Sequence, residues 1–295
     1  MASLRAHFLH ALLHRTVKDH FGRAKDARRF RKIFDKIFDR PLLRARRGVH
    51  YAPCLSGNVA CERVQARPGD RPRLFYLHGG GFVAMSSRIY RPLTGAFALR
   101  GFDVLTVDYR LAPEHPFPAA LDDAIAAWLD FSREGPAAIA GDSAGGNLAL
   151  ALMMRARDEG FTPPIAAVLF SPVTDLIGTG PSYTENAERD AIFGGHALER
   201  LAECYLGEAD PAHPYASPLA GEMRDLPPML IHVGAREVLR DDAVRLAGKI
   251  QAAGGDAELK LWKVVPHGWQ FADPLLPEAR RSLNEAAHFL KAHRP

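Results

Sequence analysis

The sequence predicts an α/β protein with a mostly parallel sheet, and three observations support this prediction. Short apolar runs typical of buried strands alternate along the chain with amphipathic helical stretches. Glycine-rich turns and chemically reactive side chains come directly after several of these runs. The 295 residues, 47% of them apolar and 24% charged, are enough for one large domain with a substantial core.

The N-terminal segment differs in charge from the rest of the chain. Residues 1–50 hold fourteen Lys and Arg against four Asp, an excess of +10, so the other 245 residues sum to −6. Apolar residues recur at helical spacing at Leu4, Phe8, Ala11 and Leu12, and again at Phe30, Ile33, Phe34, Ile37 and Phe38. Two amphipathic helices are expected, interrupted near Gly22 and ended by Pro41, with basic outer faces and apolar faces against the core.

Several function classes are disfavoured by what the chain lacks. A basic segment can meet an anionic membrane or nucleic acid, but a solvated helical face is the favoured interpretation, because no nucleic-acid motif accompanies it. No apolar run approaches a membrane span, and no secretory signal is expected. His10 and His14 have a metal-ligand spacing without a third ligand, so we expect surface histidines. Cys54, Cys61 and Cys204 favour reduced thiols in a cytoplasmic protein, with a Cys54–Cys61 disulfide as the alternative.

The predicted strands and helices follow in order after the N-terminal segment. The strands are two within 48–65 with a turn at 56–58, then 73–77, 104–108, 137–140, 166–170, 228–233 and 258–264. The helices are 88–100, 119–134, one that begins at residue 143 and includes 148–155, then 195–205, 243–253 and 278–293. The stretch from about 175 to 225 is too long for a simple connection, which indicates an inserted cap element.

The chain is organised around Gly141-Asp142-Ser143-Ala144-Gly145. This G-x-S-x-G pattern between a strand and a helix is typical of a nucleophile elbow, in which a sharp turn exposes the serine hydroxyl. The glycines allow the turn, and the helix N-terminus directs the N–H of Ala144 at developing negative charge. An ordinary strand-to-helix turn is the alternative, and Asp142 is expected to support the turn rather than to react.

A second glycine-rich loop, His78-Gly-Gly-Gly-Phe82, follows the strand at 73–77. Three successive glycines bring backbone N–H groups close to a ligand, as an oxyanion hole requires. We therefore expect the N–H groups of Gly79, Gly80 and Ala144 to bind an oxyanion. The proline-rich stretch 109–118 is expected to be an irregular loop that Glu114 and His115 anchor by hydrogen bonds.

An acid and a base follow two later strands. Glu237 and Asp241 come after the strand at 228–233, and His267 comes after the strand at 258–264. Functional groups of a parallel sheet gather at the carboxyl ends of its strands, and the chain order Ser, acid, His is that of an α/β-hydrolase. Glu237 lies closer to the end of its strand, from which its side chain can reach His267. Asp241 lies near the start of the next helix, where a carboxylate is explained by capping free N–H groups.

The sequence resembles the hormone-sensitive-lipase-like family of α/β-hydrolases, the bacterial family IV esterases. Four blocks between about residue 70 and the C-terminus carry the resemblance: His78-Gly-Gly-Gly-Phe82, Tyr109-Arg-Leu-Ala-Pro-Glu-His-Pro-Phe-Pro-Ala119, Gly141-Asp-Ser-Ala-Gly-Gly-Asn-Leu-Ala149 and Pro266-His-Gly. The family usually has Asp where this chain has Glu237. The position of Glu237 in its block marks it as the acid, and the resemblance gives Gly81 a supporting role in the glycine loop.

The resemblance implies an α/β-hydrolase fold with an eight-stranded, mostly parallel sheet flanked by helices. A helical cap would come from residues 1–45 and part of about 175–225, on a catalytic domain of residues 46–295. The implied function is a serine carboxylesterase that acts on short- to medium-chain acyl esters without metal or organic cofactor. Ser143, His267 and Glu237 would be its catalytic triad, and the acyl-enzyme would form on Ser143. Amide, carbamate or lactone substrates are alternatives to an ester. A small-molecule receptor of this fold is a further alternative, although the presence of His267 favours an enzyme. A homodimer through the last strand also stays possible in this family.

Overall fold

Eight strands form one sheet in the computed structural model, which describes residues 2–24, 26–38, 45–67, 69–193 and 196–294. The strands are β1 His50–Ser56, β2 Val59–Gln65, β3 Arg73–Leu77, β4 Asp103–Val107, β5 Ala137–Asp142, β6 Ala167–Phe170, β7 Met229–Gly234 and β8 Ala257–Trp262. Their order is β1-β2-β4-β3-β5-β6-β7-β8, and every pair from β4 to β8 is parallel, whereas β2 is antiparallel to both its neighbours. The predicted fold class is confirmed.

The strand register brings the predicted functional loops to one edge of the sheet. Leu77 at the end of β3 pairs with Gly141 of β5, and Asp142 pairs with Phe170 of β6. Phe170 in turn pairs with His232 of β7. The glycine loop, the serine turn and the segments after β6 and β7 therefore leave the sheet side by side.

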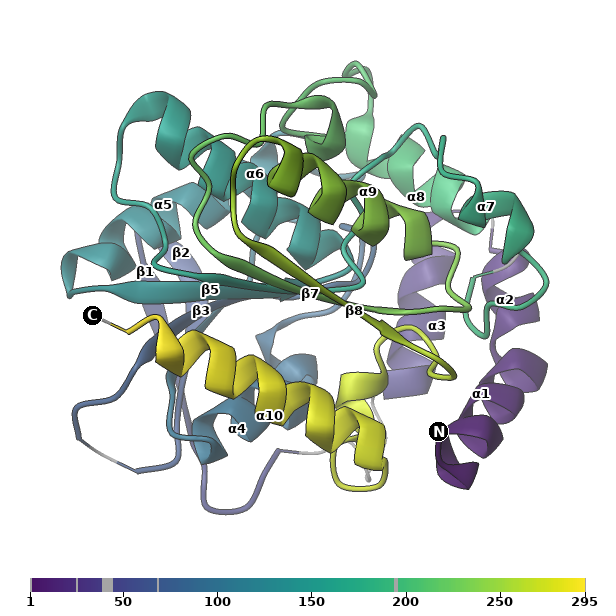
Figure 1. The fold of residues 1–295 in the computed structure, drawn as a ribbon, viewed down its shortest axis with the longest axis horizontal. Coiled ribbons are helices and arrows are strands. Elements are labelled where there is room, and N and C mark those ends of the chain that lie inside the picture. Colours follow the sequence, from purple (N-terminus) through teal and green to yellow (C-terminus); the bar gives the residue numbers. More distant parts are fainter. Residues whose placement is uncertain (1, 25, 39–44, 68, 194–195, 295) are drawn as a thin grey trace.

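Helices cover both faces of the sheet because alternate strand side chains point to opposite faces (Figure 1). The helices are α4 Ser87–Leu99 and α10 Pro277–Ala292 on one face, and α5 Ala119–Arg133, α6 Ala144–Glu159 and α9 Arg240–Ala252 on the other. Phe75 of β3 contacts Trp128 of α5, with ring centroids 5.4 Å apart. The next residue, Tyr76, contacts Phe97 of α4 at 6.1 Å, so both faces are packed with aromatic side chains.

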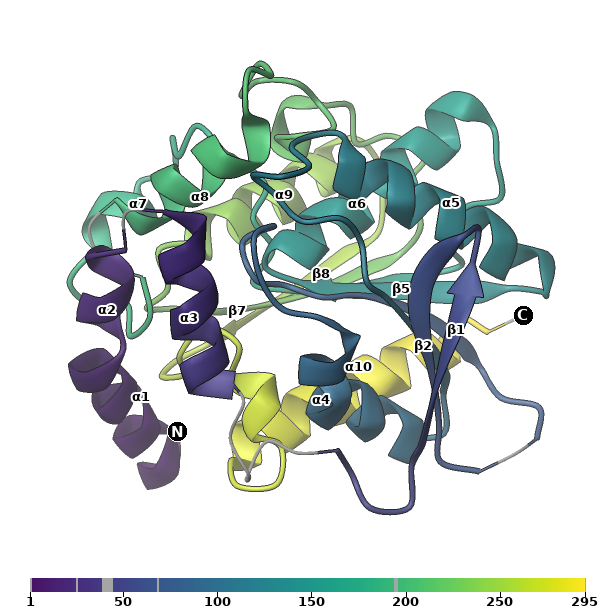
Figure 2. The ribbon, with the colours of Figure 1, turned by 180° about the vertical axis from the view of Figure 1, so that it is seen from behind.

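The N-terminal helices lie together at one side of the molecule, close to two helices of the 175–225 segment (Figure 2). They are α1 Leu4–Thr16, α2 Lys18–Gly22 and α3 Ala27–Phe38, and their neighbours are α7 Ser182–Glu185 and α8 Ala197–Leu206. The short 3₁₀ helices η2 Pro218–Ala220 and η3 Trp269–Ala272 complete the described elements. Phe21 connects the two segments, because its ring lies 5.1 Å from that of Phe34 and 5.8 Å from that of Phe193.

Most of the predicted apolar stripe of α3 is buried, with Phe30, Ile33 and Phe34 all less than a tenth exposed and Ile37 partly buried. The end of this helix at Pro41 and the side chain of Phe38 lie outside the described residues. None of the helices in the described part of the chain is long and apolar enough to cross a bilayer.

The prediction for α1 was wrong about which face is buried. Leu4, Phe8 and Leu12 are 88%, 70% and 44% exposed, whereas Ala6 and His10 on the opposite face are buried. His10 is therefore not a surface histidine. Helical periodicity distinguishes two faces of such a helix, and the face that packs here is formed by Ala6 and His10 with the partly buried Leu9 and Leu13.

The paired strands β1 and β2 place Cys54 directly opposite Cys61, and the structure holds both as free thiols. Burial raises the pKa of the Cys61 thiol to about 12, which keeps it protonated at neutral pH.

Candidate active site

Ser143 occupies a sharp turn between β5 and α6. Its backbone has φ 54° and ψ −121°, a conformation that non-glycine residues rarely adopt, and its N–H donates to the carbonyl of Phe170 over 2.9 Å. The flanking glycines are required by space: a Cβ on Gly141 would lie 2.3 Å from the carbonyl oxygen of Gly145, and one on Gly145 would lie 2.0 Å from that of Leu77. The serine hydroxyl is thereby presented at the sheet edge by a turn that tolerates only small neighbours.

Glu237 and His267 are hydrogen-bonded to each other beside this turn. The distance from His267 Nδ1 to Glu237 Oε2 is 2.7 Å. The second carboxylate oxygen, Oε1, accepts from the Ser171 hydroxyl at 2.8 Å and from the N–H of Gly234 at 2.7 Å. Glu237 is only 1% exposed. Three donors on three different segments of the chain hold its carboxylate in place.

The electrostatic environment keeps His267 basic. Burial lowers the pKa of His267, but the hydrogen bond and the negative charge of Glu237 raise it by more, so the pKa lies above its usual value. The Nδ1 atom is engaged by the carboxylate, so Nε2 is the ring nitrogen left for proton transfer. Such a pair can accept a proton from a neighbouring hydroxyl and stabilise the imidazolium that forms.

Asp142 fixes the glycine loop to the sheet. Its Oδ1 accepts from the hydroxyl of Tyr76 at 2.9 Å and from the N–H of Gly79 at 3.3 Å, and its Oδ2 accepts from the hydroxyl of Tyr90 at 2.7 Å. The N–H of Gly79 also donates to the Tyr90 oxygen at 2.7 Å. Burial raises the pKa of Asp142 although these donors oppose the shift. Asp142 therefore supports the glycine loop, and its expected absence from the reaction stays a prediction.

Two other backbone N–H groups of this loop stay available. Gly80 and Gly81 have φ +112° and +62°, and within the described residues neither N–H donates to a protein acceptor. A Cβ on Gly80 would lie 2.3 Å from the carbonyl oxygen of Ala84, so no larger residue fits there. The N–H of Ala144 begins α6 and likewise has no intrahelical acceptor. The expected donor Gly79 is already used by Tyr90 and Asp142, and that part of the prediction does not fit the observed loop.

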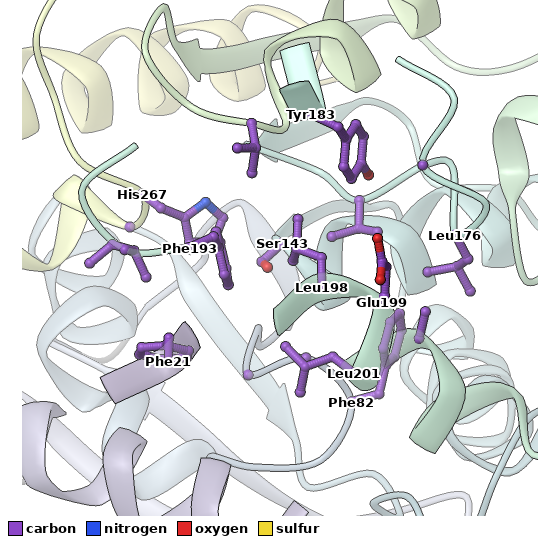
Figure 3. A pocket seen from close by; sticks show the side chains of 18 of the residues that line it. Phe21, Phe82, Ser143, Leu176, Tyr183, Phe193, Leu198, Glu199, Leu201 and His267 are labelled. Carbon is purple, nitrogen blue, oxygen red and sulfur yellow. The ribbon is translucent and has the colours of Figure 1, made fainter. Parts of the chain in front are cut away.

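Ser143 and His267 line a cavity of about 440 Å³. Figure 3 shows both side chains facing this space, with apolar side chains from α2, α8 and the segment before α8 around it. The labelled apolar residues of its wall are Phe21, Phe82, Leu176, Phe193, Leu198 and Leu201. Its mostly apolar lining suits an uncharged organic molecule better than an ion.

Comparison with known proteins decides the family. Residues 74–271 match the alpha/beta hydrolase fold family. An acetyl-hydrolase of Streptomyces hygroscopicus is 40% identical over 240 residues, which are 80% of each chain. An esterase of Acinetobacter venetianus is 34% identical over 247 residues, 82% of each.

The chain belongs to the hormone-sensitive-lipase-like esterases.

Solved structures agree over nearly the whole chain. EstE5, in a crystal soaked with p-nitrophenyl butyrate, superimposes with a TM-score of 0.92 at 34% identity and 99% coverage of both chains. An esterase from the bacterial hormone-sensitive lipase family superimposes with a TM-score of 0.91 at 33% identity, again covering 99% of both. The protein is a carboxylic ester hydrolase with an α/β-hydrolase fold.

In this esterase the second predicted acid, Asp241, lies in a different hydrogen-bond network from His267. Its Oδ2 accepts from the N–H of Ser182 at 2.8 Å, and Arg240 pairs with it at 2.7 Å. Arg240 lowers the pKa of Asp241 through a hydrogen bond, which outweighs its partial burial. Asp241 was expected to cap its own helix, but it instead accepts from the first N–H of α7, that of Ser182.

The proline-rich loop of the esterase is anchored by the N-terminal segment. Arg31 of α3 pairs with Glu114 and also donates to the carbonyls of Val83, at 2.6 Å, and Ala112, at 2.9 Å. The hydrogen bond from Arg31 lowers the pKa of Glu114 to about 2. The anchoring role predicted for Glu114 is thus confirmed, whereas His115 is exposed and has no side-chain hydrogen bond to the described residues.

Sequence reasoning missed three residues that shape the site. Tyr90 holds the glycine loop, and Ser171 orients Glu237. Asp190 is buried beside Glu237 and accepts from the N–H groups of residues 192, 193 and 238. Of the three, only Ser171 could have been found from the sequence, because it directly follows a predicted strand. Tyr90 and Asp190 are marked by no motif and come close to the site only in the folded chain.

Proposed function

We propose that this esterase hydrolyses short- to medium-chain acyl esters through an acyl-enzyme formed on Ser143. The observation that supports this most directly is the His267–Glu237 hydrogen bond of 2.7 Å, at a cavity that Ser143 also lines. The strained turn at Ser143, the free N–H groups beside it and the relatives' esterase names point the same way.

In the first half-reaction, His267 Nε2 removes the proton of the Ser143 hydroxyl as its oxygen attacks the ester carbonyl. Glu237 holds the imidazole tautomer and stabilises the imidazolium. The tetrahedral oxyanion accepts hydrogen bonds from the N–H groups of Gly80, Gly81 and Ala144. His267 then donates its proton to the alcohol oxygen as the carbon–oxygen bond breaks, which leaves the acyl group on Ser143.

In the second half-reaction, His267 removes a proton from water, which attacks the acyl carbonyl through the same oxyanion site. The carboxylic acid departs as Ser143 Oγ regains its proton. Because His267 must be neutral to act as a base, kcat/KM falls as the pH drops through the pKa of His267. The charge of Glu237 raises this pKa. Removing that charge should therefore move the fall of kcat/KM on the acid side of the pH profile to lower pH.

The size of the cavity supports the chain-length assignment. A volume of about 440 Å³ lies in the lower part of the ~300–1,000 Å³ range of small-molecule sites. It can hold a short or medium acyl chain with a small alcohol but not a triglyceride of long acids. Amides, carbamates and lactones share the carbonyl that the mechanism attacks, so they stay as alternative substrates.

Hydrolysis of p-nitrophenyl esters of increasing acyl length tests the proposal. We expect the highest kcat/KM between acetate and octanoate, and no turnover above background by Ser143→Ala. A maximum at palmitate would contradict the chain-length assignment. Saturable binding of these esters by the wild type without release of p-nitrophenol would instead favour a receptor.

A further inference from the structure

One face of α1 presents apolar side chains to solvent. Leu4, Phe8 and Leu12 are 88%, 70% and 44% exposed. At about 100° per residue they lie within about 80° of one another around the helix axis, and Ala11 and Arg15 fall on the same side. We call these five residues the outer face of α1. In Figures 1 and 2 α1 lies at the edge of the molecule, and none of the other described helices and strands covers its outer side.

The exposure of this face does not result from a loosely held helix. The inner face packs on the core through Ala6 and His10, both buried, with Leu9 and Leu13 partly buried. Ser3 fixes the N-terminus: its hydroxyl accepts from the N–H of Ala6 at 3.2 Å, and its own N–H donates to Glu278 at 2.6 Å. The apolar outer face is therefore a fixed feature of the folded surface.

The N-terminal helices carry an excess of positive charge, although the exposed Glu188 also lies against them, with its carbonyl 2.9 Å from His14 and its carboxylate 3.8 Å from Lys18. No Asp or Glu occurs in residues 1–18, and Arg5 and Arg15 are exposed on α1. Further exposed cations follow in the N-terminal segment, at Arg23, Arg28, Arg29 and Lys32. The exposed acids in the described part of residues 1–38 are Asp19 and Asp26, and Asp19 is paired with Arg23 at 3.6 Å.

We propose that the outer face of α1 docks the esterase on an anionic lipid surface. The exposed Leu and Phe of this face can enter a lipid interface, and Arg beside them without an acidic residue on the helix favours anionic lipids. Its apolar side chains would enter the acyl boundary while the arginines contact lipid phosphates. The site does not take part in the esterase reaction, since none of these residues lines the active-site cavity.

Charge argues against a second copy of the chain as the partner. In a two-fold dimer the same patch meets itself, so Arg5 and Arg15 would face the cations of the other copy. The helix carries no carboxylate to pair with them. An anionic bilayer supplies both an apolar phase and the opposite charge, which together match this face.

Co-sedimentation with vesicles tests the proposal. The wild type should bind vesicles of phosphatidylcholine with phosphatidylglycerol, bind much less to phosphatidylcholine alone, and be released by added salt. Phe8→Ser should weaken binding by about 10-fold or more, since its ring leaves water on docking. Arg15→Gln should weaken it by ~5-fold.

Leu55→Ser is the matched control. Leu55 is 71% exposed on β1, which lies on the opposite side of the molecule from α1 (Figure 2). This variant should bind like the wild type, and all variants should keep the wild-type melting temperature and p-nitrophenyl acetate turnover. Vesicle binding requires no turnover, so it can also be measured on the Ser143→Ala protein. The vesicle experiment therefore tests docking independently of the proposed catalytic mechanism.

Three results would overturn the proposal. One is no binding to the anionic vesicles, and a second is an equal loss of binding by Leu55→Ser and Phe8→Ser. The third is a wild-type dimer in sedimentation equilibrium that Phe8→Ser converts to monomer, which would assign the outer face to self-association.

Discussion

The serine turn with its glycine loop and the N-terminal segment are attached to the core in different ways. Buried hydrogen bonds hold the first region: Asp142 accepts from two tyrosine hydroxyls and one backbone N–H, and Glu237 accepts from three donors. Aromatic contacts such as Phe21–Phe34 and the Arg31 anchor hold the second. Directional hydrogen bonds fix the positions of the bonded atoms to fractions of an ångström. Apolar packing tolerates substitution by side chains of similar size and shape.

This difference suggests a division of roles between the two regions. We propose that the sheet edge carries out the chemistry, which requires fixed geometry, and that the N-terminal segment with residues 175–225 shapes the acyl and alcohol pocket. Phe21, Phe34 and Ile37 of the N-terminal segment all line the cavity, but none carries a group that could react. Variants of the two regions should therefore change different kinetic constants.

The largest expected effect is that of Ser143→Ala. Removing the nucleophile should lower kcat for ester hydrolysis by about 10⁶-fold and leave the melting temperature unchanged, because Ser143 contributes little to packing. The measurement is p-nitrophenol release under saturating substrate. Labelling of a residue other than Ser143 by a fluorophosphonate, detected by peptide mass spectrometry, would contradict the assignment.

Glu237→Gln should follow, with kcat lower by ~10³–10⁴. The amide can no longer stabilise the imidazolium, although its shape and most of its contacts are kept. Asp241→Asn is the matched control, since this carboxylate caps α7 and pairs with Arg240. It should keep its kcat and lose about 1 kcal/mol in free energy of unfolding, measured by urea denaturation. An inactive, stably folded Asp241→Asn together with an active Glu237→Gln would exchange the two roles.

Asp142→Asn should lower kcat by about 10²-fold without changing the chain-length preference. The amide presents an NH₂ group where Tyr90 or Tyr76 now donates, so the glycine loop and its free N–H groups shift. Asp158→Asn removes a similar carboxylate, which accepts from the Tyr215 hydroxyl at 2.8 Å on the surface, and should be silent. If Asp142→Asn retained full kcat, the loop would not depend on this bond network.

Arg31→Gln should have the smallest effect, a roughly 3-fold rise in KM for medium-chain esters with little change in kcat. Its pair with Glu114 is partly exposed, so solvent screening limits the stabilisation to about 1 kcal/mol. Arg133→Gln breaks the exposed pair with Asp130 and serves as the control. A large fall in kcat for acetate in Arg31→Gln would contradict the division of roles.

The sequence predicted those parts of the site in which the local backbone conformation requires particular residue types, such as glycine. The turn at Ser143 requires Gly141 and Gly145, and the loop after β3 requires glycines because of the close approach of Ala84 and Leu201. Chain order then placed Glu237 and His267 at the same sheet edge. Helix limits were harder: α9 begins at Arg240, three residues before the predicted start, because the polar residues Arg240 to Asp242 continue the helix.

The errors concern partners that are distant in the sequence. The N–H of Gly79 was expected to be free, but it donates to Tyr90, which comes from α4 and is marked by no motif. The apolar stripe of α1 was expected to be buried, but the helix packs through Ala6 and His10 instead. Periodicity reveals the faces of a helix, and only the three-dimensional arrangement decides which face meets the core.

The division of roles is tested most directly by one ratio, kcat/KM for p-nitrophenyl octanoate over kcat/KM for p-nitrophenyl acetate. We expect Glu237→Gln to lower both constants by ~10³-fold or more and to leave the ratio at its wild-type value. Phe34→Leu, in the cavity wall, should change the ratio severalfold while kcat for acetate stays near that of the wild type. A changed ratio in Glu237→Gln, or an equal loss on both esters in Phe34→Leu, would contradict the account.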